Sequence, residues 1–266
     1  MNTKISILCL STIAWMAVGA CSKIQDNPIP EQQTISFTAT LSSHSGAVTR
    51  STLTDTGSTI VAEWELGDEV LLYYKNNADA NVEALARVSA VDGSGNATLV
   101  AELENPKNGC DVTLGFPYEH WAAGLDVHDG QNGTLERINA LYNVCNGSGT
   151  LSVSGSGASL NGRINMASEM CIWKFTFSDG SQDITSSLTQ VTLGFGSSDE
   201  YVVTPSNWPN QDAYYVAVYA QSDATVTVSV KKPNPPYAAK TLTASKAGIT
   251  LEAGKFYCSE NLVVIE

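Results

Sequence analysis

Alternation of apolar and polar residues with a period of two recurs along this sequence and constrains its fold more than any other feature. The clearest run is TISFTATL at 34–41, and similar runs occupy 171–177 and 224–230. One face of the first run carries Ile35, Phe37, Ala39 and Leu41. Side chains on a strand point alternately to its two sides, so such runs fit strands that bury one face. The sequence therefore predicts an all-β fold.

A stretch rich in glycine and serine at 146–162 divides these runs into two blocks. Each block is long enough for about seven short strands with turns between them, as a β-sandwich requires. A chain of 266 residues also suits one large or two small domains. We therefore predict an N-terminal β-sandwich domain at 34–165 and a C-terminal β-sandwich domain at 166–266.

The amino-terminal segment has the organisation of a secretory signal. After a positive start, its apolar run at 5–18 is shorter than the about 20 residues that a membrane span needs. The ending at 18–21 resembles a bacterial lipobox, in which the Cys21 thiol would take a lipid. An ordinary secretory signal with a chance cysteine is the alternative. We predict a lipoprotein signal peptide at 1–20 and, because the next residues are polar, a flexible tether at 21–33.

The composition is acidic and excludes several kinds of function. There are 27 Asp and Glu residues against 14 Lys and Arg, and the formal net charge is −13. Nucleic acids require clustered cations, so the sequence predicts no nucleic-acid partner. No nucleophile-elbow pattern and no C-x-x-C pair occurs, so we expect no enzymatic activity, no cofactor and no metal site. A hydrolase with carboxylates far apart in sequence would escape this reasoning.

Four cysteines lie beyond the signal region: Cys110, Cys145, Cys171 and Cys258. An exported protein can form disulfides, and four cysteines allow three pairings between which the sequence does not choose. Buried free thiols are the alternative, and both remain open at this point.

Several ordered motifs together resemble a known family. They are ISFTATL, VTR at 48–50, AEWELGDEVLLYY at 62–74, CDVTLGFPYEHW at 110–121, INMASEMCIWKFTF at 164–177 and ITLEAGKFYCSENLVV at 249–264. In this order, behind a lipobox, they resemble the fimbrillins, the type V pilins and pilin-like lipoproteins of Gram-negative anaerobes. The resemblance covers most of 34–266.

This resemblance implies two tandem transthyretin-like Greek-key β-sandwiches and a fimbrial subunit that is exported as a lipoprotein to the outer membrane surface. It also implies that an arginine-specific protease removes the first strand, after which a strand of the next subunit fills the groove. The implied partners are other pilin subunits, the membrane through the lipid, and a host protein or glycan receptor. The place of the subunit as stalk, tip, anchor or accessory component is left open.

Arg50 is the candidate cleavage site, because it lies between the strand-like run at 34–41 and the Ser/Thr-rich 51–59. Cleavage there would make 34–41 a removable strand and expose a sheet edge that accepts another strand. The candidate donor strand is Leu262, Val263, Val264 and Ile265. A solvated arginine in a surface loop is the alternative for Arg50.

Three aromatic residues in proline-flanked stretches are candidate ligand contacts: Tyr118, Trp121 and Trp208. Exposed rings can stack on sugars or enter a pocket of a partner, whereas the alternative is that they plug the ends of the cores. The runner-up function is therefore a surface lipoprotein that binds a glycan or a host protein and does not polymerise. Trp64 and Trp173 lie inside strand-like runs and are predicted to be core residues.

Two polar patterns also resemble metal sites. Asp126, His128 and Asp129 form a local cluster, which we interpret as a polar loop, with a metal site as the alternative. The stretches 92–96 and 179–183 have the spacing of calcium loops but lack the glutamate at the twelfth position. We predict hairpin turns at both.

Overall fold

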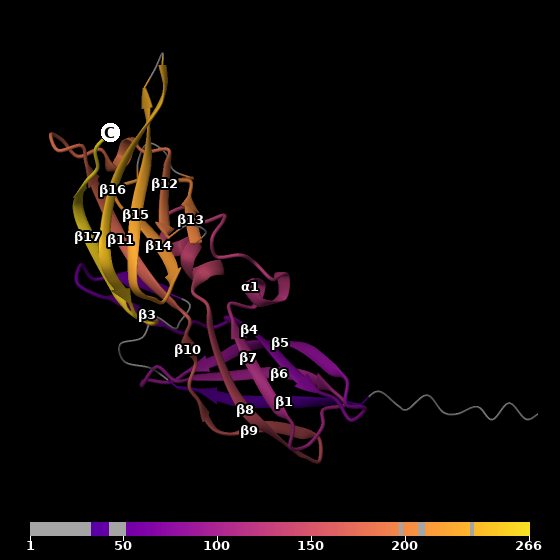
Figure 1. The fold of residues 1–266 in the computed structure, drawn as a ribbon. Helices are drawn as coiled ribbons and strands as arrows, with labels where there is room; N and C mark the ends of the chain where they lie inside the picture. The colour runs from indigo at the N-terminus through magenta and orange to yellow at the C-terminus, as the bar shows by residue number, and fades with distance from the viewer. Residues whose placement is uncertain (1–32, 43–51, 197–198, 207–210, 235–236) are drawn as a thin grey trace, which may run out of the picture. The chain divides into compact units, whose positions relative to one another are not determined.

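The computed structural model describes residues 33–42, 52–196, 199–206, 211–234 and 237–266 (Figure 1). Most of these residues lie in strands, and the sheets enclose two separate hydrophobic cores. The prediction of an all-β fold is confirmed. Within these ranges no helix is long and apolar enough to span a membrane.

Eight strands form the sheet around the first core. They are β1 (Thr34–Leu41), β4 (Glu69–Lys75), β5 (Asn81–Val91), β6 (Ala97–Glu104), β7 (Asp111–Phe116), β8 (Cys145–Ser154), β9 (Gly157–Ile164) and β10 (Ala167–Ser168). Their order is β10-β8-β7-β4-β5-β6-β1-β9, and β8 also pairs with β9, so the sheet closes on itself. As a result, β1 is an interior strand with a neighbour on each side (Figure 1).

The first core is filled by the inward faces of these strands. The inward residues of β1 are Ile35, Phe37, Ala39 and Leu41, each no more than 4% exposed. Trp64 packs edge-on against Phe116, with 5.2 Å between the ring centroids. The predicted turn at 92–96 joins β5 to β6, and the Asp92 carboxylate accepts the N–H groups of Ser94 and Asn96 there. Local turn chemistry therefore sets this hairpin, as the sequence predicted.

Two further sheets enclose the second core. One has the order β14-β11-β17, from β11 (Met170–Ser178), β14 (Tyr214–Tyr219) and β17 (Phe256–Val263). The other has the order β13-β12-β15-β16, from β12 (Gln190–Phe195), β13 (Asp199–Val203), β15 (Gln221–Asn234) and β16 (Tyr237–Leu251). A short 3-10 turn, η2 (Thr185–Ser187), follows β11. Trp173 is 8% exposed in this core and Trp64 is 4% exposed in the first, so both predicted core tryptophans are confirmed.

Segments from the first half of the chain complete the second core. The hairpin of β2 (Thr52–Asp55) and β3 (Ile60–Glu63) contributes Leu53, Ile60 and Ala62. The connection from β7 to β8 contains α1 (Tyr118–Ala123), α2 (Leu135–Arg137) and the π-helical turn η1 (Ile138–Tyr142), and it contributes Ile138 and Leu141. The second core is therefore built from pieces that are far apart in the sequence.

Residues 128–133 of this connection lie along the edges of both sheets of the second core. The Val202 N–H donates to the His128 carbonyl at 2.8 Å, and the Tyr215 N–H donates to the Gly133 carbonyl at 2.9 Å. The buried Gln131 side chain bonds both the N–H and the carbonyl of Ala217. This segment therefore bridges β13 to β14.

Near the predicted domain boundary, the chain passes from the first hydrophobic core to the second within a few residues. Met166 packs in the first core and Met170 in the second. The division at 165 and 166 stays a prediction, because the second core also takes residues from the β2–β3 hairpin and from the β7–β8 connection. The transthyretin-like Greek-key topology likewise stays a prediction.

Replacing Phe37 by alanine is expected to lower the free energy of unfolding by about 3–5 kcal/mol, because it removes an enclosed ring from the first core. Thr38→Ala is the matched control. Thr38 is next to Phe37 in β1 but its side chain is exposed, so its replacement should lower the free energy of unfolding by less than about 1 kcal/mol. Denaturant unfolding of both variants measures the difference. Equal losses would contradict the place of β1 in the core.

Candidate functional site

Strand β1 is held from both sides by backbone hydrogen-bond ladders, and this makes it the centre of the candidate site. Its antiparallel pairing with β6 covers the whole strand. Its parallel pairing with β9 runs from Ser36 to Leu41, with an irregularity between Thr38 and Thr40. Removal of β1 would leave the facing edges of β6 and β9 without partners, and such edges are templates for another strand.

The two faces of β1 differ as the alternation predicted. The apolar face is buried, whereas Thr34, Ser36 and Thr38 on the other face are exposed. The Ser36 hydroxyl donates to the Glu102 carboxylate on β6 at 2.7 Å. A strand that replaced β1 would therefore meet an apolar groove on one side and the polar side chains of β6 and β9 on the other.

The hairpin that follows β1 in the chain is anchored in the other core. Asp55 at the end of β2 accepts hydrogen bonds from the Lys174 ammonium at 2.6 Å and from the Tyr215 hydroxyl at 2.7 Å. The Lys174 and Asp55 side chains are 17% and 13% exposed, respectively. Arg50, the candidate cleavage site, lies in the connection between β1 and this hairpin and outside the described residues. Both ends of that connection are thus held by different cores.

Asp55 and Lys174 each stabilise the charged form of the other. Burial opposes ionisation of Asp55, but hydrogen bonds from Lys174 and Tyr215 outweigh it and lower the pKa of the carboxyl group. The hydrogen bond to Asp55 raises the pKa of Lys174. Burial, together with the Asp55 carboxylate, raises the pKa of Tyr215 to about 12. The pair is therefore ionised at neutral pH.

The candidate donor strand lies at the end of β17. Val264 is fully buried, and its N–H donates to the Ser178 carbonyl at 3.0 Å. Ile265 is 63% exposed, and its backbone exchanges two hydrogen bonds with Thr243 of β16. Val263 is also exposed, whereas Leu262 is half-buried. The role of Leu262, Val263, Val264 and Ile265 as a donor stays a prediction.

Two of the three candidate aromatic contacts lie on α1. Trp121 is half-buried: its indole N–H donates to the Phe116 carbonyl at 3.1 Å, and its ring covers Gly115 of β7. A Cβ at Gly115 would lie 2.6 Å from the ring, so this contact requires glycine. Tyr118 is also half-buried, and Trp208 lies outside the described residues. The packing of Trp121 corresponds to the alternative in which the ring plugs the end of a core.

The four cysteines are free thiols in the structure, which corresponds to the alternative to disulfides. Cys110, Cys145 and Cys171 are buried, and Cys258 is exposed. Burial raises the pKa of Cys171 to about 12 and also raises the pKa of Cys145. Thiols with such pKa values are poor nucleophiles at neutral pH. The buried cysteines therefore act as small apolar side chains. Cys21 lies outside the described residues.

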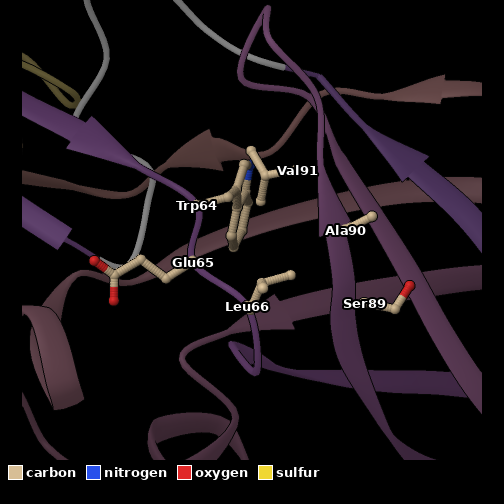
Figure 2. A pocket seen from close by; sticks show the side chains of 6 residues that line it. All are labelled: Trp64, Glu65, Leu66, Ser89, Ala90 and Val91. Atoms are coloured by element: carbon tan, nitrogen blue, oxygen red, sulfur yellow. The ribbon is translucent and has the colours of Figure 1, made fainter.

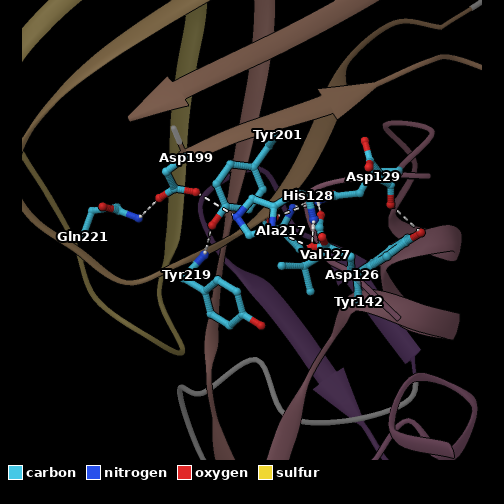
Figure 3. Close-up of polar contacts among 11 residues, drawn as sticks. Asp126, Val127, His128, Asp129, Tyr142, Asp199, Tyr201, Ala217, Tyr219 and Gln221 are labelled. Carbon is cyan, nitrogen blue, oxygen red and sulfur yellow. Dashed lines mark hydrogen bonds and ion pairs between the residues drawn. The ribbon is translucent and has the colours of Figure 1, made fainter. Parts of the chain in front are cut away.

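The polar loop at Asp126, His128 and Asp129 forms a latch between two distant segments (Figure 3). The His128 ring bonds Asp126 through Nδ1 at 2.5 Å and Asp199 of β13 through Nε2 at 2.8 Å. Its ring also lies 4.4 Å from that of Tyr201, centroid to centroid. In the described part of the chain no group of three acidic, cysteine or histidine residues could hold a metal.

A surface hollow of about 710 Å³ lies beside the connection between β3 and β4 (Figure 2). Its lining residues are Trp64, Glu65, Leu66, Ser89, Ala90 and Val91. Leu66 is 71% exposed, but Trp64 is almost fully buried and presents no open ring face. A sugar could therefore not stack on this indole, and the hollow offers only a small apolar contact.

Sequence reasoning missed the Asp55–Lys174–Tyr215 group and the partner of His128. Asp55 and Lys174 are 119 positions apart, and His128 and Asp199 are 71 apart. No local spacing signals such pairs. The only available signal was a lysine inside an otherwise apolar strand-like run at 171–177, which requires a partner if it is buried.

Replacing Asp55 by alanine should lower the free energy of unfolding by about 2 kcal/mol, because it leaves the Lys174 ammonium and the Tyr215 hydroxyl without their acceptor. Asp79→Ala is the control, since Asp79 pairs with Lys107 at the exposed surface and its loss should have a much smaller effect on stability. Chemical unfolding compares the two variants. If Asp55→Ala lowered the free energy of unfolding no more than the control did, the result would contradict the anchoring role of Asp55.

The His128 latch makes stability depend on pH. Partial burial opposes protonation of His128, but its hydrogen bonds to Asp126 and Asp199 outweigh burial and raise its pKa above the ordinary 6.5. A raised pKa in the folded state contributes stability below about pH 6.5, and this is lost as the pH rises through the folded-state pKa. Unfolding measured from pH 5.5 to 8.5 should show this decline in the natural chain. The His128→Gln variant should lack it, and an identical pH profile in both proteins would contradict the latch.

Comparison with known proteins gives structural matches only. No family model and no curated protein matches the chain. It is similar to a "putative cell adhesion protein" from Bacteroides uniformis, with 12% identity and a TM-score of 0.44 over 88% of this chain and 93% of that one. A "putative cell adhesion protein" from Bacteroides ovatus gives 13% identity and a TM-score of 0.41 over 88% and 94% of the two chains. The chain is also similar to a fimbrial protein from Bacteroides ovatus, with 12% identity and a TM-score of 0.38. This match covers 78% of the present chain but only 46% of that protein.

Proposed function

We propose that this chain is a fimbrial subunit that assembles by strand exchange, with β1 as the strand that is removed. One observation carries the proposal: β1 is an interior strand that fills its core with a complete apolar face. Its inward side chains are almost entirely enclosed, and its backbone pairs with β6 and β9 on both sides. Its removal would create a defined groove rather than a frayed edge.

Cleavage after Arg50 would separate β1 from the remainder of the protein. The residues that follow Arg50 enter the β2–β3 hairpin, which Leu53 and Asp55 anchor in the second core. The new amino terminus would therefore stay in place, while β1 would be held only by non-covalent contacts. In this proposal the signal peptide at 1–20 has already been cut off before Cys21, and the Cys21 lipid and the tether at 21–33 would leave with β1.

An incoming strand would restore both the hydrogen-bond ladders and the core. Burial of side chains such as Ile35, Phe37 and Leu41 contributes about 1.5–3 kcal/mol each. Association and ordering of the strand cost several kcal/mol, so the two ladders must also form for the assembly to be stable. The proposal requires a donor strand from another subunit, and Leu262–Ile265 is the donor that the fimbrillin resemblance implies.

The same proposal assigns the location and the fold. The subunit is exported as a lipoprotein, reaches the outer membrane through the Cys21 lipid, and becomes part of a surface fimbria. Acyl chains hold a protein to a membrane by about 0.8 kcal/mol per buried methylene, so a multiply acylated cysteine gives a stable anchor. The two cores correspond in this proposal to two transthyretin-like domains. The partners are other pilin subunits, and a host receptor belongs to a tip position.

Limited digestion with an arginine-specific protease tests the proposal. We expect one dominant early cut after Arg50, because Arg87, Arg137 and Arg163 lie in strands or helices. The cut protein should then form ladders that resist SDS without heating. Denaturing and non-denaturing gels of the same samples measure both steps.

The matched control is Arg50→Gln, which should remain uncut at this position and monomeric under the same conditions. A cut protein that stays monomeric and only loses stability would overturn the assembly role. It would leave β1 as an ordinary structural strand.

A further inference from the structure

We infer that the β1 groove selects its partner by a specific pattern of side-chain size and charge, and that the carboxyl-terminal run 256–266 does not fit this pattern. The pattern is bulky, bulky, small, bulky at the four inward positions, with a basic residue favoured near the start of the outward face. This inference rests on the proposed function and names the class of partner.

The incoming strand is assigned the direction of β1, antiparallel to β6 and parallel to β9. In this direction it restores both hydrogen-bond ladders that β1 forms. The positions of the partner strand can therefore be numbered by the β1 residues they replace.

The third inward position, that of Ala39, requires a small side chain. Ala39 lies opposite Leu99 of β6 and is only 4% exposed. Ala39 therefore lies inside the first core, directly across from a fully buried leucine. A larger residue would have to displace packed side chains, which destabilises a core.

The outward face carries a gradient of charge. At its start, Thr34 and Ser36 lie opposite Glu104 and Glu102, both exposed on β6. At its end, Thr40 lies opposite Arg163 of β9. Opposite charges across a strand pair are favourable and like charges are unfavourable. A lysine or arginine at position 34 or 36 of the partner should therefore strengthen binding.

The carboxyl-terminal run of this chain does not fit the groove. In every seven-residue window of 256–266, either Glu260 or Asn261 occupies an inward position. A carboxylate or an amide without a partner is costly to bury. Withdrawal of this run would also uncover Val264, which is fully buried. The groove therefore requires a strand with four uninterrupted apolar inward positions, and the run 256–266 does not supply one.

The test is competition of synthetic peptides for the groove of the full chain after cleavage at Arg50. A fluorescent peptide of residues 33–42 reports occupancy by polarisation. The unlabelled competitors are the same peptide, its Ala39→Phe, Ser36→Lys and Ser36→Glu variants, and the peptide 256–266. Cleaved protein that carries Glu102→Gln is the matched control for charge.

We expect the unmodified peptide to compete and Ala39→Phe to be about 10- to 100-fold weaker. Ser36→Lys should bind about two- to tenfold better than Ser36→Glu, and Glu102→Gln should reduce that difference. The peptide 256–266 should not compete. If Ala39→Phe or 256–266 competed as well as the unmodified peptide, the inference would be overturned while strand exchange stood. If no labelled peptide entered the groove, strand exchange would fail and the inference with it.

Discussion

Burial of one strand between two others is the interaction on which the rest of this structure depends. The sheet around the first core closes only because β1 joins β6 to β9. Its alternating side chains fill the centre of the ring, and its hydroxyl-bearing face stays in water. A single eight-residue strand therefore supplies both closure and core. Such an arrangement stabilises the protein strongly, yet it concentrates that stability in one segment near the amino terminus.

The chain connects this strand to a hairpin that belongs to a different core. The β2–β3 hairpin is fixed by apolar packing and by Asp55, whose carboxylate bonds Lys174 and Tyr215. The first strand and the hairpin that follows it are therefore held by different cores.

Much of the fold could be predicted from local patterns, and the failures have a common physical cause. The period of two in 34–41 gave the inward face of β1 correctly, and the turn residues at 92–96 gave the β5–β6 hairpin.

Partners distant in sequence could not be predicted. Nothing near Asp55 indicates that it meets Lys174, and nothing near His128 indicates Asp199. These contacts arise from the tertiary arrangement, which one sequence does not encode in any local spacing. For the same reason the alternation predicts that β1 is half-buried, but it does not predict that β1 has two neighbours of opposite direction.

The bridging segment at 128–133 has a consequence for how the molecule reaches its native state. It joins β13 to β14 through His128, Gln131 and Gly133, and all the strands that it joins are made later in translation. These contacts close long loops, and folding that depends on such closures is slow. A fragment that began at residue 166 would lack this bridge and would leave the edges of two sheets open to mispairing. The segment at 128–133 can therefore make these contacts only after β13 and β14 have been synthesised.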